Sequence, residues 1–550
     1  MKRKIALMLT TTLVATSFTG LTAFANEGSS SIVTEAGTFP IVTEPTTIKV
    51  FLVQPANVSS LDDNEVTKAI EEKTGIDLEI ITATQDNAKE KMSILLASGD
   101  YPDMFLATGV SHQFTNEELM LYGKEQGIFI PLNDLIDKYG DSIKNVIETD
   151  PDYASEIVAP DGNIYGLPSW ELAYHCTFPS KLWINQQWLD NLGLEAPKTT
   201  DEFYEVLKAF KEQDPNGNGI ADEIPLTGLN SHVFLMNPFI YTNNLTYFFI
   251  NEEGKVDYAP IQDEWREGLR FMKKLYDEEL LDSGAFTSSR EQITTLGTNP
   301  DAALLGAVTA LHPGHFVSIS DDKPRHTEYT ALEPLTGPEG KNYAMYDLTA
   351  YAGASCVITD ACENPEAAFR LADYLASEEG TLLTTTGLEG VGWRKAEDGE
   401  LNILGEPADY TRLEYTHVSG EAHNKNWGNE NFHFTGSELN GLRGKWTYDQ
   451  DIYTLNGYER RLFQETQNKY EGHQNEQKSF SVFLDPEVTD TAYQLKVNLE
   501  DYVNQSLVRF VTGDLDIEKD WDSYIQQMKD LQVEEYLEIY NTAYEAKYGG

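Results

Sequence analysis

The stretch IKVFLVQPANVSSLDDNEVTKAIEEKTGIDLEII, residues 48–81, sets the fold class of this chain. It begins with a β-branched and aromatic run at 48–53, which predicts a strand. A helix that ends at Gly75 and an alternating strand at 76–81 are expected next. The same order of helix and strand recurs and ends at Leu106. Strands that alternate with helices indicate right-handed βαβ units and a parallel sheet.

A second α/β region is expected after segment 161–168. Thr199 and Glu202 form a capping box there, because each side chain can bond the backbone N–H of the other residue. Trp265 lies on the apolar stripe of a further helix and is expected in a core. A chain of 550 residues is too long for one core, so two large lobes are expected.

Composition excludes several classes of function. The formal net charge is −50, which argues against binding nucleic acid or attracting polyanionic ligands. There are only three cysteines, too few for a disulfide scaffold. Cys356 and Cys362 could pair only if a turn brought them together, and buried free thiols are the favoured interpretation.

The N-terminus indicates export. Lys2, Arg3 and Lys4 precede an apolar run that ends at Ala23-Phe24-Ala25, so residues 1–25 are interpreted as a signal peptide. A membrane anchor is disfavoured because Thr and Ser interrupt the run and it is short for a bilayer. Residues 26–45 have no helical or strand period and are expected to be a flexible linker. The protein is therefore expected outside the cell or at its surface.

Catalytic signatures are missing from the sequence. It contains no G-x-S-x-G elbow, no H-E-x-x-H and no phosphate-binding loop ending in Lys-Ser/Thr. His312 and His315 have no third metal ligand near them in sequence, so a turn is the favoured interpretation. A secreted carbohydrate-active enzyme remains the alternative, but with 90 acidic residues no carboxylate pair stands out as a glycosidase dyad. The prediction is that the protein is not an enzyme.

Segment 214–223 carries the pattern of a calcium loop. Oxygen-bearing side chains alternate at its start, and Gly219 permits the sharp turn that an EF-hand-like loop needs. It departs from an EF-hand because the closing acid comes early and Pro225 follows. A polar loop that caps the preceding helix is the alternative. We expect a structural Ca²⁺ site whose ligands are Asp214, Asn216, Asn218, the carbonyl of Ile220, Asp222 and Glu223.

Together with that loop, short motifs along the chain resemble the family 1 extracellular solute-binding proteins of ABC importers. The likeness is to the large lipoprotein-like subgroup of Gram-positive bacteria, including alginate- and oligosaccharide-binding members. One departure is that Ala25-Asn26 stands where many members carry a lipid-attachment Cys, which puts retention at the cell surface in doubt. The motifs are EEKTGID at 71–77, SGDYPD at 98–103, DGNIYGLP at 161–168, LWIN at 182–185, NPEAA at 364–368, FVTG at 510–513 and WDSY at 521–524.

The resemblance implies a two-lobed α/β fold of the periplasmic-binding-protein-like type II class, with a hinge and a ligand cleft between the lobes. We expect residues 46–168 with 303–350 in lobe 1, and 169–302 with 351–550 in lobe 2. The implied function is capture of a small solute, an oligosaccharide above all, for the membrane subunits of an ABC importer. The protein is expected to be a monomer, and a peptide or polyamine receptor on the same fold is the alternative. In the alginate-binding relatives the equivalent loop binds calcium away from the cleft.

A sugar site needs aromatic platforms for C–H faces and polar side chains for hydroxyls. The hinge crossing that the family implies follows segment 165–168 and places a tryptophan near the cleft. Two further tryptophans lie in Gly-flanked loops and off any helical stripe. The expected ligand-binding residues are Trp170, Tyr174, His175, Glu389, Trp393, Trp427 and Asp103.

Overall fold

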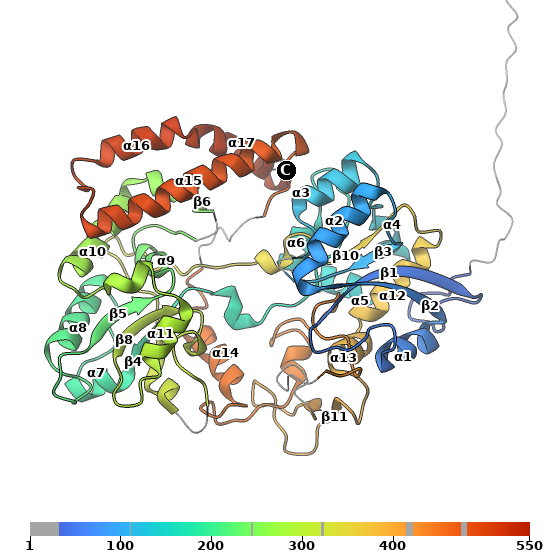
Figure 1. Ribbon diagram of the computed structural model, residues 1–550, viewed down its shortest axis with the longest axis horizontal. Coiled ribbons are helices and arrows are strands. Elements are labelled where there is room, and N and C mark those ends of the chain that lie inside the picture. The colour runs from blue at the N-terminus through green and yellow to red at the C-terminus, as the bar shows by residue number, and fades with distance from the viewer. Residues whose placement is uncertain are drawn as a thin grey trace, which may run out of the picture.

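The chain forms two α/β lobes, each built on its own four-stranded sheet (Figure 1). The expected signal peptide lies outside the described residues. Among the residues described, no helix combines the length and the apolar character that a membrane crossing requires. The computed structural model describes residues 32–109, 112–243, 246–320, 324–413, 422–474 and 481–549.

Lobe 1 is built on a sheet of order β10-β3-β1-β2. Its strands are β1 (Thr46–Gln54), β2 (Ile76–Thr84), β3 (Met104–Leu106) and β10 (Cys356–Ile358). β1 pairs in parallel with β2 and β3, as the βαβ pattern predicts, whereas β10 is antiparallel to β3. Its helices are α1 (Glu65–Thr74), α2 (Ala88–Ser98), α3 (Asn116–Leu119), α4 (Asn133–Tyr139), α5 (Ser142–Thr149), α6 (Pro151–Ile157), α12 (Pro365–Ala376) and α13 (Glu378–Thr386).

The apolar run of β1 is continuous because both faces of the sheet are covered. Val50 and Leu52 belong to the core under α1 and α12, whereas Phe51 and Val53 belong to the core that holds Met92 of α2. Successive side chains of a strand point to opposite faces, and a sheet buried on both sides therefore needs an unbroken apolar run. The predicted class of α/β fold is confirmed in this lobe.

The first described residues pack on lobe 1. Ile41 is fully buried, and the backbone N–H of Thr34 donates to its carbonyl at 2.8 Å. The guanidinium of Arg370 on α12 donates to the carbonyls of Thr34 and Thr38 at 2.7 and 2.9 Å. The expectation of a flexible linker through residue 45 is therefore wrong from residue 32 on, because these residues satisfy their backbone groups against the lobe.

Lobe 2 is built on a mixed sheet of order β5-β8-β4-β9. Its strands are β4 (Lys181–Asn185), β5 (Ile224–Gly228), β8 (Leu305–Ala310) and β9 (Tyr329–Leu332). β5 and β8 are parallel, and β4 is antiparallel to both β8 and β9. The helices of this lobe are α7 (Gln186–Leu192), α8 (Thr200–Glu212), α9 (Ser231–Met236), α10 (Asp263–Asp277), α11 (Arg290–Gly297), α14 (Tyr458–Lys469), α15 (Pro486–Thr512), α16 (Trp521–Asp530) and α17 (Val533–Tyr548).

The sheets correct the expected division of the chain between the lobes. Residues 303–350 contain β8 and β9, which pair in the sheet of lobe 2 rather than lobe 1. Residues from 351 on include β10, which closes the edge of the sheet of lobe 1. Strand membership depends on pairing across hundreds of residues, which local sequence patterns do not specify.

The C-terminal helices pack on lobe 2 but return to lobe 1 at their ends (Figure 1). The segment before α15 inserts Phe483 into a core of lobe 1, and Asn116 Nδ2 donates to Ser481 Oγ at 2.8 Å. At the other end, Lys547 Nζ lies 3.9 Å from a carboxylate oxygen of Glu156 on α6, and both side chains are buried. The C-terminal helices therefore connect the two lobes.

Candidate functional site

Segments that cross between the lobes meet at one junction (Figure 1). The first crossing leaves lobe 1 where the N–H of Leu167 donates to Cys356 O, and then forms the short 3₁₀ helix η3 (Tyr174–Thr177) before β4. A later crossing bonds to it from Asp347 N to Thr177 O at 2.9 Å. Another bonds from Gly436 N to Trp170 O at 2.7 Å.

Charged side chains gather where these segments meet. The carboxylate of Glu171 lies 3.0 Å from His433 Nε2 and 3.1 Å from a guanidinium nitrogen of Arg443. Lys181 is also buried here, and its Nζ donates to the carbonyls of His175 and Phe178. We call the following set the junction cluster: Glu171, His175, His433, Glu438, Arg443 and Glu459.

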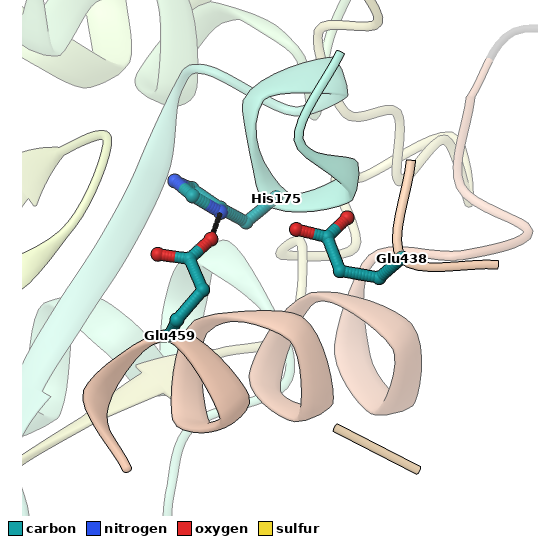
Figure 2. A group of neighbouring side chains, drawn as sticks. All are labelled: His175, Glu438 and Glu459. Atoms are coloured by element: carbon teal, nitrogen blue, oxygen red, sulfur yellow. Dashed lines mark ion pairs between the residues drawn. The ribbon is translucent and has the colours of Figure 1, made fainter. Parts of the chain in front are cut away.

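The other half of the junction cluster holds a histidine and two acids (Figure 2). His175 Nδ1 lies 3.0 Å from Glu459 Oε1. Glu438 accepts a hydrogen bond from the backbone N–H of Tyr174 at 2.6 Å. The three side chains come from η3, from α14 and from the loop before α14, and each offers a ligand atom within 4.8 Å of the others.

The cluster shifts the protonation of its members. Burial alone raises the pKa of Glu171, but the neighbouring His433 and Arg443 outweigh it and lower the value to about 2. Burial lowers the pKa of His175, but contacts with Cys176 and Glu459 outweigh it and raise the value to about 9. Burial lowers the pKa of Lys181 to about 7. The junction thus holds Glu171 ionised although it is largely removed from water, whereas burial raises the pKa of Glu438.

The predicted calcium loop follows α8 and has the turn that its glycines predict. Gly217 and Gly219 adopt φ values of 70° and 77°, a region that favours glycine. The carboxylate of Asp214 accepts from the backbone N–H of Gly219 at 3.0 Å. The amide nitrogens of Asn216 and Asn218 point to Asp222 at 3.0 and 3.1 Å. The loop therefore brings four of the six expected ligand residues close together.

Two observations test whether the loop fits a cation. Glu223 Oε1 is buried and has no hydrogen-bond donor in the described structure. Burial raises the pKa of Glu223, and the nearby Asp222 and Asp214 raise it further. An unpaired carboxylate oxygen among like charges is what a hard cation such as Ca²⁺ would stabilise. The residues of the loop therefore fit a calcium ion.

Trp393 and Glu389 lie together at a pocket of about 800 Å³ on lobe 1. Trp393 is part of β11 (Trp393–Lys395), which pairs with β12 (Tyr410–Arg412). Its ring packs edge-on against Tyr410 at 5.1 Å, and Tyr374 also lines the pocket. The indole N–H donates to Gly387 O at 3.0 Å. Trp393 is half-buried, so part of its ring faces the pocket.

The other two predicted tryptophans lie in the core of lobe 1. Trp427 is 1% exposed, and its indole N–H donates to Thr67 Oγ1 at 2.9 Å. Trp170 is 8% exposed and donates to Asp150 at 2.7 Å. The expectation that they form exposed platforms is wrong in this structure, because the irregular segments that carry them run through the core.

The remaining predicted ligand residues are separated. The ring of Tyr174 packs 5.4 Å from Phe463 at the junction. His175 is buried in the junction cluster, so its ring is not open to a solute. Asp103 immediately precedes β3 and accepts a hydrogen bond from Lys49 N at 2.7 Å. The structure thus groups Tyr174 with His175 and Trp393 with Glu389, and places Asp103 elsewhere.

Sequence reasoning missed most of the junction cluster. Glu171, Glu438 and Glu459 are three acids among 90, and no motif marks them. His433 and Arg443 lie in a segment without helical or strand period. What distinguishes these residues is that their charges are buried. This can be recognised only in the folded chain, where the crossing segments come together. Cys356 and Cys362 are buried free thiols, the interpretation favoured for them from the sequence.

Comparisons with known proteins cover nearly the whole chain. A family model described as bacterial extracellular solute-binding protein matches residues 59–382. The chain is 29% identical to the fructooligosaccharide ABC transporter substrate-binding protein FusA of Streptococcus pneumoniae, over 98% of this chain and 97% of that protein. A structure of a FusA EF-hand mutant in complex with fructo-nystose matches with TM-score 0.64 and 23% identity, covering 91% of this chain and 99% of that one. An HMO-binding solute-binding protein from Bifidobacterium longum infantis matches with TM-score 0.73 and 21% identity, at the same coverage.

Proposed function

The chain belongs to the family of bacterial extracellular solute-binding proteins, and from this membership we propose that it captures an oligosaccharide for an ABC importer. Its fold is that of solved solute-binding proteins, as the resemblance implied. The observation that carries the proposal is the pair of lobes with separate cores, joined by segments that meet at one junction. Such an architecture holds a solute between two bodies that can close on it.

The oligosaccharide class rests on the relatives and on the aromatic surface. FusA is named for fructooligosaccharides, and the likeness to it extends over almost the full length of both chains. The half-buried Trp393 with Tyr374, Tyr410 and Glu389 offers ring faces beside a carboxylate, the combination that sugar contacts need. We propose Trp393 and Glu389 as sugar contacts on lobe 1, and the junction as the floor of the site between the lobes.

A thermal-shift panel tests the ligand class. Purified protein is melted with fructooligosaccharides, alginate and galacturonan oligosaccharides, polyamines and short peptides. A ligand at a hundred times its Kd stabilises the folded state by about 2.7 kcal/mol, and so raises Tm. A response to polyamines or peptides and to no glycan would place the receptor in another ligand class.

The same panel separates binding from catalysis. We propose that the glycan which raises Tm is recovered intact after prolonged incubation, since a transport receptor delivers its solute unchanged. Release of shorter sugars or reducing ends, in step with enzyme concentration, would instead support the secreted carbohydrate-active enzyme. The membrane subunits of the importer are the proposed partner.

We further propose that loop 214–223 binds Ca²⁺ in a structural role. Its support is the wrapped oxygen set and the buried, unpaired oxygen of Glu223. A solved FusA variant is described as an EF-hand mutant, so a related chain carries a loop of this kind. When bound, the ion would be held by the side chains of the loop and the Ile220 carbonyl, and would neutralise their charge.

Export with removal of residues 1–25 completes the proposal, and N-terminal sequencing of the secreted protein should begin at Asn26.

A further inference from the structure

Three buried atoms at the junction lack the hydrogen bonds that burial normally demands. They are His175 Nδ1, Glu438 Oε1 and Glu459 Oε1. None makes an aligned hydrogen bond among the described residues, although the first and the last form an ion pair with each other at 3.0 Å. A buried polar group without a hydrogen bond destabilises the folded state, and the cost is greater when the group is charged. The three side chains face the same space (Figure 2). Their joint lack of aligned hydrogen bonds indicates that a further group belongs between them.

The geometry between His175 and Glu459 resembles that of two ligands of one ion. Their nearest atoms are 3.0 Å apart, yet the contact lacks the alignment of a hydrogen bond. Two groups whose lone pairs converge on a common point come close without pointing at each other. The carboxylate of Glu438 completes the set, since all three side chains offer a ligand atom within 4.8 Å of the others.

The remaining atoms of two of these side chains are already held. His175 Nε2 lies 3.4 Å from Cys176 Sγ, so an Nε2–H donated to sulfur leaves the Nδ1 lone pair free. Glu438 Oε2 accepts the backbone N–H of Tyr174, which leaves Oε1 free. Outer contacts of this kind fix the tautomer and orientation of metal ligands.

We propose that His175, Glu438 and Glu459 bind a Zn²⁺ ion. One imidazole and two carboxylates are a donor set that suits zinc, whereas Ca²⁺ and Mg²⁺ prefer oxygen ligands alone. A water molecule would complete a tetrahedral shell. The ion would join η3, α14 and the loop before α14, and so fix three of the segments at the junction. Its role would be structural.

The positive charge of Arg443 bears on the expected affinity for zinc. Arg443 lies close enough to act on both Glu438 and Glu459, although its direct contact is with Glu171. A fixed cation weakens binding of a second one, so we expect micromolar rather than picomolar affinity. Without zinc, a proton on His175 would take its place beside Glu459, and this is the competing explanation of the cluster.

Equilibrium dialysis of metal-free protein against Zn²⁺, with saturating Ca²⁺ present, tests the site. Ca²⁺ fills loop 214–223 and removes it as a competitor. We expect about one zinc per chain, a loss of affinity of at least tenfold in Glu438→Gln, and no tight binding in His175→Gln. His112→Gln is the matched control, because His112 forms a similar 3.0 Å pair with Glu430 but belongs to no such three-residue group among the described residues. Its zinc affinity should stay at the wild-type value.

X-ray absorption at the zinc edge tests the site without any substitution. It should show one nitrogen and two or three oxygens at about 2.0–2.2 Å. Melting curves without zinc establish that each variant is folded, and Glu438→Asp replaces Glu438→Gln if the latter is not. Wild-type protein that binds no zinc at 100 µM, or equal losses in Glu438→Gln and His112→Gln, would overturn the proposal.

Discussion

At the scale of single residues, the three predicted tryptophans differ in whether their rings are buried or exposed. Trp427 and Trp170 lie in segments without regular structure, yet both are in the core of lobe 1. Each satisfies its indole N–H, on Thr67 and Asp150. Trp393 also donates its N–H but keeps part of its ring at a pocket. A loop position therefore does not by itself mean an exposed ring.

Replacing Trp427 by Ala should destabilise the protein strongly. Removing a fully buried Trp costs about 3–5 kcal/mol, because the core loses contacts and keeps a cavity. Thermal melting of Trp427→Ala and Trp393→Ala measures the difference, and we expect the larger fall in Tm for Trp427→Ala. Affinity for the glycan found in the panel should fall for Trp393→Ala and stay nearly unchanged for Trp427→Ala at a temperature where both are folded. Equal melting temperatures for the two variants would contradict the assignment of Trp427 to the core.

Acid should weaken the junction through Glu171. Its pKa is lowered from 4.5 to about 2 in the folded protein, so its contribution to stability is present above pH 4.5 and is lost as pH falls towards 2. We expect that loss to be on the order of 2 kcal/mol, since one pKa unit is worth about 1.4 kcal/mol and the side chain keeps 28% exposure. Urea unfolding of wild type and Glu171→Gln from pH 7 to pH 2.5 measures it. The variant should be less stable at pH 7 and nearly equal to wild type at the acid end; a constant gap would refute this.

The candidate site was the least predictable part of the molecule at this scale. His175 and Tyr174 were placed at the crossing from sequence, because they follow the segment at 165–168. Their acidic partners were not, since Glu438 and Glu459 lie over 250 residues away in sequence. Ion pairs between such distant positions depend on the folded chain, and no local pattern encodes them.

At the scale of elements, local signals predicted helix ends accurately. Asn64 caps α1 through its side chain, and Gly75 ends the helix with φ 75°. Thr199 and Glu202 form the expected capping box at the start of α8. These signals work because a cap involves residues only a few positions apart. The membership of β8, β9 and β10 was predicted wrongly, because strand pairing across the chain has no such local signal.

The loop after α8 should make stability depend on calcium. Adding Ca²⁺ to metal-free protein at a hundred times Kd should stabilise the fold by about 2.7 kcal/mol, measured as a rise in Tm. Asp214→Ala removes a carboxylate that also accepts the N–H of Gly219, and should abolish the rise. Asp398→Ala, an exposed acid elsewhere, is the matched control and should respond like wild type. Wild-type protein whose Tm ignores Ca²⁺ would show that the loop is a polar cap only.

At the scale of the whole molecule, the described residues join the lobes at two places. The crossing segments meet at the junction, and the C-terminal helices hold both lobes through Phe483 and Lys547. Any closing motion must therefore bend the crossing segments while the C-terminal contacts move with, or slide against, lobe 1. This limits the directions in which the lobes can rotate.

Binding of the solute should draw the lobes together. Small-angle scattering of the protein with and without the glycan found in the panel should show a smaller radius of gyration in the complex, by hinge closure. A glycan that leaves Tm unchanged serves as the control and should leave the radius unchanged. The same radius at saturation would mean that the solute binds one lobe alone, or that the lobes are already closed.

The interleaving of the two sheets also governs the order in which the protein can be built. Every strand of the sheet of lobe 2 precedes β10, which completes the sheet of lobe 1, and the helices α14 to α17, which also pack on lobe 2, come later still. A growing chain therefore cannot finish either core until most of it has left the ribosome. Contacts between such distant parts of a chain form slowly. The proposed leader would send this chain through a secretion channel. The delay keeps the polypeptide unfolded, and so able to pass through the channel, until its synthesis is nearly complete.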